Sequence, residues 1–211
     1  MTKSLCIIPA RGGSKRIPKK NIKDFLGKPI IAYSIEAALK SGLFDIVMVS
    51  TDDIEIAEVA NEYGATVPFM RSADNADDYA TTTDVILEVL QQYEKQGEVF
   101  DYACCIYPTA PLITVGRLNE AFDLLLNCDY SAVFPVLAFS YPIFRSFKMM
   151  DRGKVELNWP ENLNSRSQDL PAAYHDAGQF YWFGVKDFFK DSVVFGPNSG
   201  AITLDEMEVQ D

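Results

Sequence analysis

The sequence predicts one α/β domain, in which helices cover both faces of a mainly parallel sheet. Its 211 residues, 48% of them apolar, suffice for one sizeable core, and the length does not favour two full domains. Up to about residue 138, short apolar runs alternate with segments whose apolar residues recur at helical spacing. In "YACCIY", strand alternation would point Cys104 and Cys105 to opposite faces of the sheet, which favours reduced thiols in the core.

The first part of the chain supplies strands and helices in turn. The run "SLCIIPA", bounded by Pro9 and Gly12, predicts a strand that is buried on both faces and leads into a loop. The segment "PIIAYSIEAALKSG" predicts a helix with Pro29 in its first turn and Gly42 just past its end. We then expect the strand "DIVMVST", the helix "DDIEIAEVANEYG" with its opening aspartates as cap and dipole partners, and the strand "ATVPFM", although Pro68 disfavours it.

The same alternation continues as far as residue 136. The polar loop "RSADNADDYATTT" ends in threonines, one of which we expect to cap the next helix. We predict the helix "DVILEVLQQYEKQG", the strand "DYACCIY", the loop "PTAPLI", the helix "VGRLNEAFDLLLNC" and the strand "SAVFPV". Later come the strand "AGQFYWFGV", the short helix "KDFFKD" and the extended run "GAITLDEMEVQD". Since no closing helix follows, we expect the chain to be cut short at Asp211.

Between about residues 139 and 170 the alternation stops. The pattern contains no amphipathic helix, and two extended runs flank "DRGK", which predicts a hairpin turn. The segment is rich in Phe, Tyr, Met and Trp, so we expect a β-rich insertion that forms the contact of a homodimer. The alternative is a β-extension that packs on its own domain.

Charge and cysteine usage narrow the classes of partner. A net charge of -11 and a pI of about 4.6 argue against binding to nucleic acid or to an anionic membrane. The four cysteines lack metal-ligand spacing, and no apolar run is long enough to span a bilayer. Lys3 and Ser4 lead straight into a strand without a signal peptide, so we expect a cytoplasmic protein.

Positive charge gathers in one loop, "IIPARGGSKRIPKKN". The loop follows the first predicted strand, which is the usual place for a phosphate in an open α/β sheet. Its glycines let the backbone approach an anion, and Arg11, Lys15 and Lys20 can neutralise two or three phosphates. The spacing matches neither the P-loop nor the dinucleotide fingerprint. We therefore expect a phosphate site of another kind, against the alternative of a solvated basic loop.

This loop resembles the signature of the cytidylyltransferases that activate nine-carbon α-keto sugar acids. The resemblance continues through "GKPIIAYSIEAALKSGLFD", "YPTAPL" and "NSRSQDLPAAYHDAGQFYW", and so covers essentially the whole chain. The last stretch is most similar to the branch that acts on pseudaminic acid, with the sialic acid and legionaminic acid enzymes as alternatives.

The resemblance implies a Rossmann-like, three-layer α/β/α nucleotidyltransferase fold in residues 1–211. It also implies that CMP passes from CTP to the anomeric hydroxyl of a nonulosonic acid, with release of pyrophosphate and with Mg²⁺ as the cofactor. Two alternatives come from other classes. One is a non-catalytic module that senses CTP, and the other is a nucleic-acid binder, which the acidic remainder of the chain disfavours.

The resemblance further implies which residues form the site. Arg11 and Lys20 are the catalytic cations, which would stabilise charge on the α-phosphate and the departing pyrophosphate. Asp211 would hold Mg²⁺ as the first of two aspartates, the second falling beyond the end of this sequence. The nucleotide contacts are Ala10, Arg11, Gly12, Gly13, Ser14, Lys15, Lys20, Asn21, Arg71 and Thr82. The sugar contacts are Tyr107, Thr109, Arg166, Gln168, His175, Asp176, Gln179 and Tyr181.

Several of these residues also fit a second role. Arg71 is expected to read the cytosine edge, but a loop arginine can also pair with an aspartate of "SADNADD". His175 suits a general base or, alternatively, a hydrogen-bonded structural residue beside a strand. Arg166 can bind the substrate carboxylate, or bridge to Asp169 or to another subunit. Tyr107 stands where related sialic acid enzymes tend to have Gln, which implies a different sugar acid.

Overall fold

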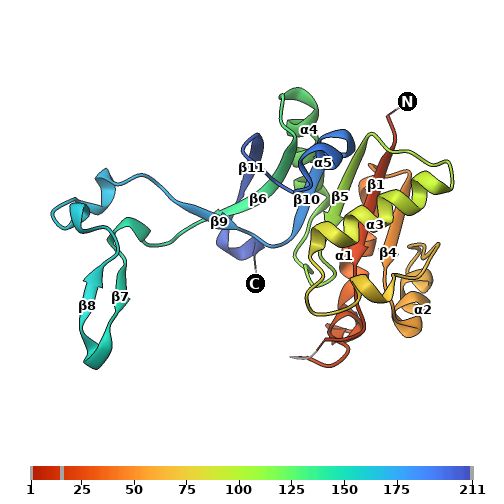
Figure 1. Cartoon of the computed structure of the whole chain (residues 1–211), viewed down its shortest axis with the longest axis horizontal. Helices are drawn as coiled ribbons and strands as arrows, with labels where there is room; N and C mark the ends of the chain where they lie inside the picture. Colours follow the sequence, from red (N-terminus) through yellow and green to blue (C-terminus); the bar gives the residue numbers. More distant parts are fainter. Residues whose placement is uncertain (1, 15–16, 210–211) are drawn as a thin grey trace.

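A mixed, mainly parallel β-sheet forms the centre of the molecule (Figure 1). The computed structural model describes residues 2–14 and 17–209. The strands lie in the order β11, β6, β10, β5, β1, β4; β10 runs antiparallel to β5 and β6, and β9 pairs antiparallel with the end of β6. The strands are β1 (Ser4–Pro9), β4 (Ile46–Ser50), β5 (Tyr102–Ile106), β6 (Ala132–Ala138), β9 (Tyr174–Asp176), β10 (Phe180–Gly184) and β11 (Ser199–Leu204). The predicted α/β fold class is confirmed.

Helices cover both faces of this sheet, as the alternating pattern predicted. One face packs against α1 (Ile30–Ser41), α2 (Ile54–Glu62) and α4 (Val115–Asn127), and the other against α3 (Thr82–Lys95) and α5 (Val185–Asp191). Cys104 and Cys105 are buried as free thiols in the two opposite apolar layers. Burial raises the pKa of Cys105 to about 12, which keeps this thiol protonated. No helix in the described ranges is both long and apolar enough to cross a bilayer.

Local residue chemistry sets the ends of the helices. Thr81 caps α3 and forms a reciprocal capping box with Asp84, as the threonine run predicted. Asp53 caps α2, with its carboxylate accepting from the backbone N–H groups of the first turn. Gly42 ends α1 with φ of 66°, a conformation that favours glycine. Pro29 lies at the N-cap of α1 rather than in its first turn.

The structure corrects the prediction at four other places. The segment "ATVPFM" forms no strand and makes a single bridge, between Thr66 and Met48, because Pro68 lacks the N–H that a longer ladder needs. The short hairpin of β2 (Asp24–Phe25) and β3 (Lys28–Pro29) and the strand β9 were not predicted. The final run is extended only through β11, after which the chain turns into the 3₁₀ helix η7 (Glu206–Glu208).

Residues 139–173, here called the arm, leave the sheet at the end of β6 and return as β9 (Figure 1). The predicted hairpin is present: β7 (Phe147–Met149) and β8 (Val155–Leu157) pair antiparallel around a turn. The arm also contains the 3₁₀ turns η3 (Ile143–Arg145), η4 (Asp151–Gly153), η5 (Pro160–Asn162) and η6 (Ser167–Asp169). It projects away from the sheet and its helices instead of folding back on them.

Candidate active site

A cleft of about 920 Å³ opens beside the carboxyl ends of β1 and β5. The carboxyl ends of parallel strands form the usual ligand crevice of an open α/β sheet. The predicted site residues that line the cleft are Arg11, Ser14, Lys20, Asn21, Arg71, Thr82, Tyr107 and Thr109. The fold therefore brings together the predicted phosphate loop, the predicted base-reading arginine and two of the predicted sugar contacts.

Hydrogen bonds hold the described part of the phosphate loop in place. The Arg11 guanidinium donates to the carbonyl of Asp77 at 2.5 Å and forms an ion pair with Asp78 at 2.8 Å. Asn21 is 4% exposed, and its Nδ2 donates to the carbonyl of Arg11 at 2.9 Å. Lys20 lies next to this anchored asparagine and reaches the wall of the cleft. Both predicted catalytic cations are thus attached to a fixed backbone.

Gly12 contacts the two aspartates that precede α2. The Gly12 N–H donates to the Asp52 carboxylate at 2.9 Å, and the Ser14 N–H donates to the Gly12 carbonyl at 2.9 Å. A Cβ atom on Gly12 would lie 2.6 Å from Oδ2 of Asp53, so a larger residue would push the loop away from α2. Sequence reasoning assigned Asp52 to the cap of α2 and missed its bond to the loop. Because Gly12 and Asp52 are 40 positions apart in the sequence, no local sequence pattern indicates that they pair.

Arg71 enters the cleft from a buried position. It is 8% exposed; its Nε donates to Oγ of Ser50 at 3.0 Å and its Nη2 donates to the Ser50 carbonyl at 2.6 Å. The backbone N–H of Arg71 donates to the carbonyl of Thr51 at 2.8 Å. Burial lowers the pKa of Arg71 below its usual value. The structure therefore fixes the guanidinium on the end of β4, where the alternative expectation had it paired with an aspartate of the following loop.

Side chains with hydroxyl groups gather around the end of β5 and the start of β10. Oγ1 of Thr82 lies 3.4 Å from Oη of Tyr107, and the Tyr107 ring meets the Tyr181 ring edge-on at 5.5 Å. The Tyr181 hydroxyl donates to the Asp176 carboxylate at 2.5 Å. The Tyr107 N–H donates to the carbonyl of Gln179 at 2.9 Å, which joins the end of β5 to the start of β10. Of the predicted sugar contacts, this set places three in one group.

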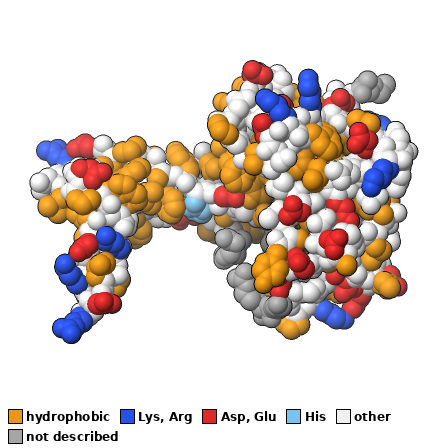
Figure 2. Space-filling view, viewed as in Figure 1, with side chains coloured by type: hydrophobic (Ala, Val, Ile, Leu, Met, Phe, Trp, Pro, Cys, Tyr) orange, Lys and Arg blue, Asp and Glu red, His pale blue; other side chains and the backbone are white. Residues whose placement is uncertain are grey.

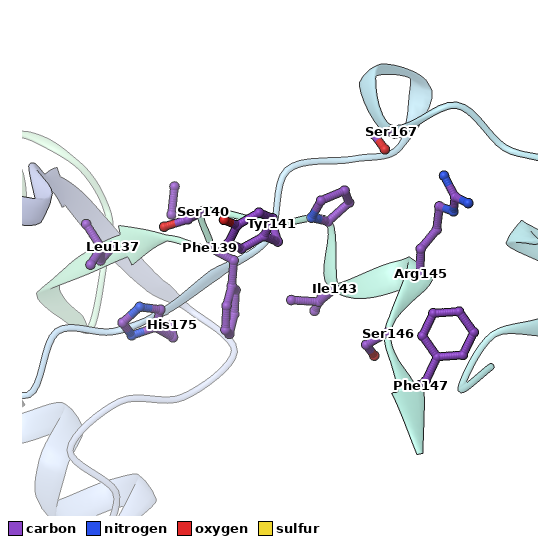
Figure 3. Close-up of a pocket in the computed structure, with 12 residues that line it drawn as sticks. Leu137, Phe139, Ser140, Tyr141, Ile143, Arg145, Ser146, Phe147, Ser167 and His175 are labelled. Atoms are coloured by element: carbon purple, nitrogen blue, oxygen red, sulfur yellow. The ribbon is translucent and has the colours of Figure 1, made fainter. Parts of the chain in front are cut away.

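Three predicted sugar contacts, Arg166, Gln168 and His175, lie elsewhere. A second hollow of about 590 Å³ sits where the arm leaves the domain (Figure 3). His175 lines this hollow; its ring is 4.9 Å from that of Phe139, and its Nδ1 is 2.9 Å from the Asp176 carbonyl. Arg166 and Gln168 are exposed on the arm itself. Within one chain, these three side chains do not line the cleft.

The last described segment of the chain passes close to the cleft. Arg117 holds the Glu208 carboxylate with two donors, Nε at 3.0 Å and Nη2 at 2.7 Å. Nε2 of Gln179 donates to the carbonyl of Glu208 at 2.5 Å. Gly178, the neighbour of Gln179, lines the cleft. The segment that leads to the predicted metal ligand is therefore held beside the candidate site.

The predicted metal ligand Asp211 and the predicted phosphate contact Lys15 lie outside the described residues. Within the ranges that the structure describes, no three His, Cys, Asp or Glu side chains gather in a way that could hold a metal ion. Mg²⁺ bound to a nucleotide usually takes one or two protein carboxylates and keeps several waters, so it needs no such group. Asp78 brings one hard carboxylate to the cleft wall, which fits an ion that takes most of its ligands from phosphates.

The Arg117 and Glu208 pair predicts a pH-dependent contribution to stability. Hydrogen bonds from Arg117 lower the pKa of Glu208 from 4.5 to about 2. Because this pKa is lower in the folded chain than in the unfolded one, the contribution is complete above about pH 4.5 and is lost as the pH falls toward 2. We expect Glu208→Gln to lower the free energy of unfolding at pH 7, and the difference from the wild type to shrink across that window. Urea denaturation at a series of pH values measures this difference.

An exposed glutamate at the end of α2 gives the control for that measurement. Glu62→Gln is expected to change the free energy of unfolding little at any pH, since Glu62 is exposed. If the free energies of unfolding of Glu208→Gln and the wild type differed by the same amount from pH 7 to pH 2, the assigned role of the ion pair would be contradicted.

Comparison with known proteins assigns the chain to a class. Residues 5–192 match the cytidylyltransferase family, and the chain belongs to this family of CTP-dependent nucleotidyltransferases. A solved structure, CMP:2-keto-3-deoxy-manno-octonic acid synthetase complexed with CTP, superposes with a TM-score of 0.68 at 19% identity, covering 96% of this chain and 91% of the other. At that identity the likeness shows the shared fold.

Two relatives with established names are more similar in sequence. The pseudaminic acid cytidylyltransferase of Campylobacter jejuni subsp. jejuni serotype O:2 is 46% identical over 202 residues, which are 96% of this chain and 87% of the relative. A Helicobacter pylori protein named pseudaminic acid cytidylyltransferase and UDP-2,4-diacetamido-2,4,6-trideoxy-beta-L-altropyranose hydrolase is 40% identical over 212 aligned positions, and the alignment covers 99% of this chain and 40% of that protein.

Proposed function

We propose that this chain transfers CMP from CTP to the anomeric hydroxyl of pseudaminic acid. The observation that carries the proposal is the 46% identity over 96% of the chain to a protein named for this activity. In the reaction, the anomeric oxygen forms a bond to the α-phosphorus of CTP and loses its proton. The bond from the α-phosphorus to the bridging oxygen breaks, and pyrophosphate leaves with the electron pair.

The cleft supplies what this transfer requires. Nucleotidyl transfer depends on positioning and on neutralising charge that shifts to the leaving group, more than on covalent participation by the protein. We assign Arg11 and Lys20 to the α-phosphate and the departing pyrophosphate. The backbone from Ala10 to Ser14, together with Lys15, Asn21 and Thr82, completes the proposed nucleotide site. The ion pair with Asp78 holds the Arg11 guanidinium at the cleft before substrate enters.

Arg71 is the proposed reader of the base. Its guanidinium is fixed by Ser50, so it presents donors in a set direction. The N3 position of cytosine is an acceptor, whereas N3–H of uracil is a donor that would face another donor. We expect Arg71→Met, which keeps an unbranched apolar stem, to lower the preference for CTP over UTP in kcat/KM by about 10- to 100-fold.

The ratio of kcat/KM for CTP to kcat/KM for UTP does not depend on how much of the enzyme is folded. A change in this ratio therefore reports base recognition alone. Arg117→Met is the matched control, because Arg117 lies outside the cleft lining and binds Glu208 instead. The control is expected to keep the wild-type ratio. An unchanged ratio in Arg71→Met would remove Arg71 from base recognition.

Mg²⁺ is the proposed cofactor, held by Asp211 and by the phosphates. When bound, it would neutralise phosphate charge and orient the triphosphate. Arg117 and Gln179 hold Glu208, three residues before Asp211, next to the cleft, which supports a metal ligand from this segment.

A homodimer formed through the arm is the proposed assembly. Apolar side chains gather along the arm (Figure 2), and Tyr141, Phe147 and Met149 are 83%, 59% and 74% exposed. An apolar surface of this kind is typical of a protein contact. The sugar-binding roles predicted for Arg166, Gln168 and His175 require the arm to approach a cleft, and packing on a second copy is the arrangement that we propose. Light scattering tests it by the mass in solution. A cytoplasmic location stays a prediction.

Pyrophosphate release with CTP and a panel of sugar acids tests the proposed function. Pseudaminic acid is expected to give the highest kcat/KM among pseudaminic, N,N'-diacetyllegionaminic and N-acetylneuraminic acids. Turnover of N-acetylneuraminic acid with none of pseudaminic acid would overturn the assigned sugar while leaving the family unchanged. Binding of CTP without release of pyrophosphate, in the presence of Mg²⁺ and every sugar acid, would favour a CTP-sensing module.

A further inference from the structure

Strands β1 and β4 lie side by side (Figure 1), and hydrogen bonds between their two chain segments continue past the end of β1. Pro9 and Ser50 are the last paired residues, and the N–H of Ala10 donates to the Ser50 carbonyl at 2.9 Å. In a longer parallel ladder, the next bond would run from the Gly12 N–H to the Asp52 carbonyl. The Gly12 N–H donates instead to the side-chain Oδ1 of Asp52, at 2.9 Å.

These bonds fix the backbone on both sides of Arg11, the proposed catalytic cation. Ala10 and Gly12 are its neighbours in the chain, and the Arg11 carbonyl accepts from Nδ2 of the buried Asn21 at 2.9 Å. Arg11 lines the cleft, whereas Asp52 lies outside the described lining of the cleft. The Asp52 carboxylate therefore holds the loop from outside the cleft.

The loop also packs tightly against the start of α2. A Cβ atom on Gly12 would lie 2.6 Å from Oδ2 of Asp53, whose other oxygen accepts from the N–H of Glu55 at 2.8 Å. Asp53 thus limits how closely the loop can approach α2, and the bond to Asp52 keeps the loop from moving away. Farther along the loop, Lys19 forms an ion pair with Glu55, but both side chains are exposed, and such pairs contribute little.

Residues 50–53 also hold Arg71, the proposed reader of the base. The Ser50 carbonyl accepts from Nη2 of Arg71 at 2.6 Å, and the Thr51 carbonyl accepts from the backbone N–H of Arg71. These bonds use the backbone and Oγ of Ser50, whereas the loop is held by the Asp52 side chain. Replacing Asp52 can therefore loosen the loop around Arg11 while the bonds of Arg71 stay in place.

We propose that Asp52 is a positioning residue, which holds Arg11 at the phosphates of CTP by accepting the hydrogen bond of Gly12. The inference rests on the proposed function, because it takes Arg11 as the cation that stabilises the α-phosphate and the departing pyrophosphate. Asp52 touches no substrate and acts through the backbone of the loop. The bond requires an acceptor oxygen but no negative charge, since a carboxylate near a triphosphate would by itself oppose binding.

Two substitutions of Asp52 separate the acceptor from the charge in assays with CTP, Mg²⁺ and pseudaminic acid. Asp52→Ala is expected to lower kcat about 10- to 100-fold, because a displaced cation no longer matches the transition state. Asp52→Asn keeps the acceptor oxygen, and its kcat is expected to stay within about threefold of the wild type. Both variants are expected to keep the wild-type preference for CTP over UTP in kcat/KM, because Arg71 keeps its bonds.

Arg11→Ala shows whether Asp52 acts through Arg11. The double variant Arg11→Ala with Asp52→Ala is expected to match Arg11→Ala in kcat, since Asp52 has no guanidinium left to position. Calorimetric titration with CTP and Mg²⁺ provides a second readout that needs no sugar acid. The Kd for CTP is expected to rise about threefold to tenfold in Asp52→Ala and to rise less in Asp52→Asn.

Asp45→Ala is the matched control. The Asp45 carboxylate accepts from the backbone N–H of Ser4 at 2.7 Å, which is a bond of the same kind at the opposite end of β1. Its loss is expected to leave kcat, both KM values and the Kd for CTP unchanged. Melting temperatures compare the folding of all the variants.

The outcomes separate this inference from the proposed function. Wild-type kcat and Kd values in Asp52→Ala would overturn the inference, and so would equal losses in Asp52→Asn and Asp52→Ala, which would assign the effect to charge. Effects of Arg11→Ala and Asp52→Ala that add in the double variant would also overturn it, since additive effects mean independent roles. Failure of the wild type to use pseudaminic acid would overturn the proposed function, and the calorimetric comparison would still support or overturn the inference.

Discussion

Replacing Lys20 with Ala is expected to lower kcat about 100- to 1000-fold, while the KM values for CTP and the sugar acid change far less. Lys20 begins the 3₁₀ turn η1 (Lys20–Ile22), and the buried Asn21 beside it is bonded to the backbone of Arg11. The anchored backbone places the Lys20 side chain on the cleft wall, where its charge can neutralise the departing pyrophosphate. Its contribution is therefore greatest in the transition state, and for that reason the substitution is expected to lower kcat more than it changes KM.

Lys23 gives the matched control for this prediction. It directly follows the same turn, is exposed, and does not line the cleft. Lys23→Ala is expected to retain the wild-type kcat and KM values, which would show that a lysine near the loop is not sufficient. Steady-state and single-turnover rates measure both variants. A Lys20→Ala enzyme with the wild-type kcat would remove Lys20 from the chemistry.

Removal of Mg²⁺ by a chelator is expected to lower turnover about 1000-fold or more. A divalent ion that neutralises the transferring phosphate contributes several kcal/mol to the transition state, and about 1.4 kcal/mol corresponds to a factor of ten. Activity should return when Mg²⁺ is added in excess of the chelator. Full turnover in the chelator would contradict a role for the metal.

The proposed ligand is tested by the Mg²⁺ concentration that gives half-maximal activity. Asp211→Asn should raise this concentration, because an amide oxygen is a weaker ligand than a carboxylate for a hard cation. Asp205→Asn is the control, since Asp205 forms the capping box of η7 and belongs to the same terminal segment. An equal shift in both variants would indicate that the segment moved, and would argue against Asp211 as the ligand.

The sequence predicted the layered core well because short-range patterns determine it. Alternation within a strand placed Cys104 and Cys105 on opposite faces, and the spacing of apolar residues marked the helices. The loop after β1 was predicted as the phosphate site because strand order and glycine content are both visible in the sequence. In the structure its described residues Arg11, Ser14 and Lys20 line the cleft.

The remaining features depend on contacts between distant residues. Nothing local indicates that β10 lies between β5 and β6, or that β9 pairs with the end of β6. The same holds for the bond from Gly12 to Asp52. "ATVPFM" has strand composition, yet its pairing ends after one bridge because a proline interrupts it. The composition of the arm predicted a β-rich insertion. It did not indicate that the arm projects away from the sheet and its helices, as Figure 1 shows.

Identification of the products made from CTP, pseudaminic acid and Mg²⁺ is the decisive experiment for the proposed activity. Phosphorus NMR distinguishes the phosphodiester of a CMP-sugar from pyrophosphate and from unreacted triphosphate. We expect CMP-pseudaminic acid and pyrophosphate to appear in equal amounts, and neither to form when the sugar acid is omitted. CTP that stays intact with pseudaminic acid present, or pyrophosphate that forms without a CMP-sugar, would contradict the proposed activity.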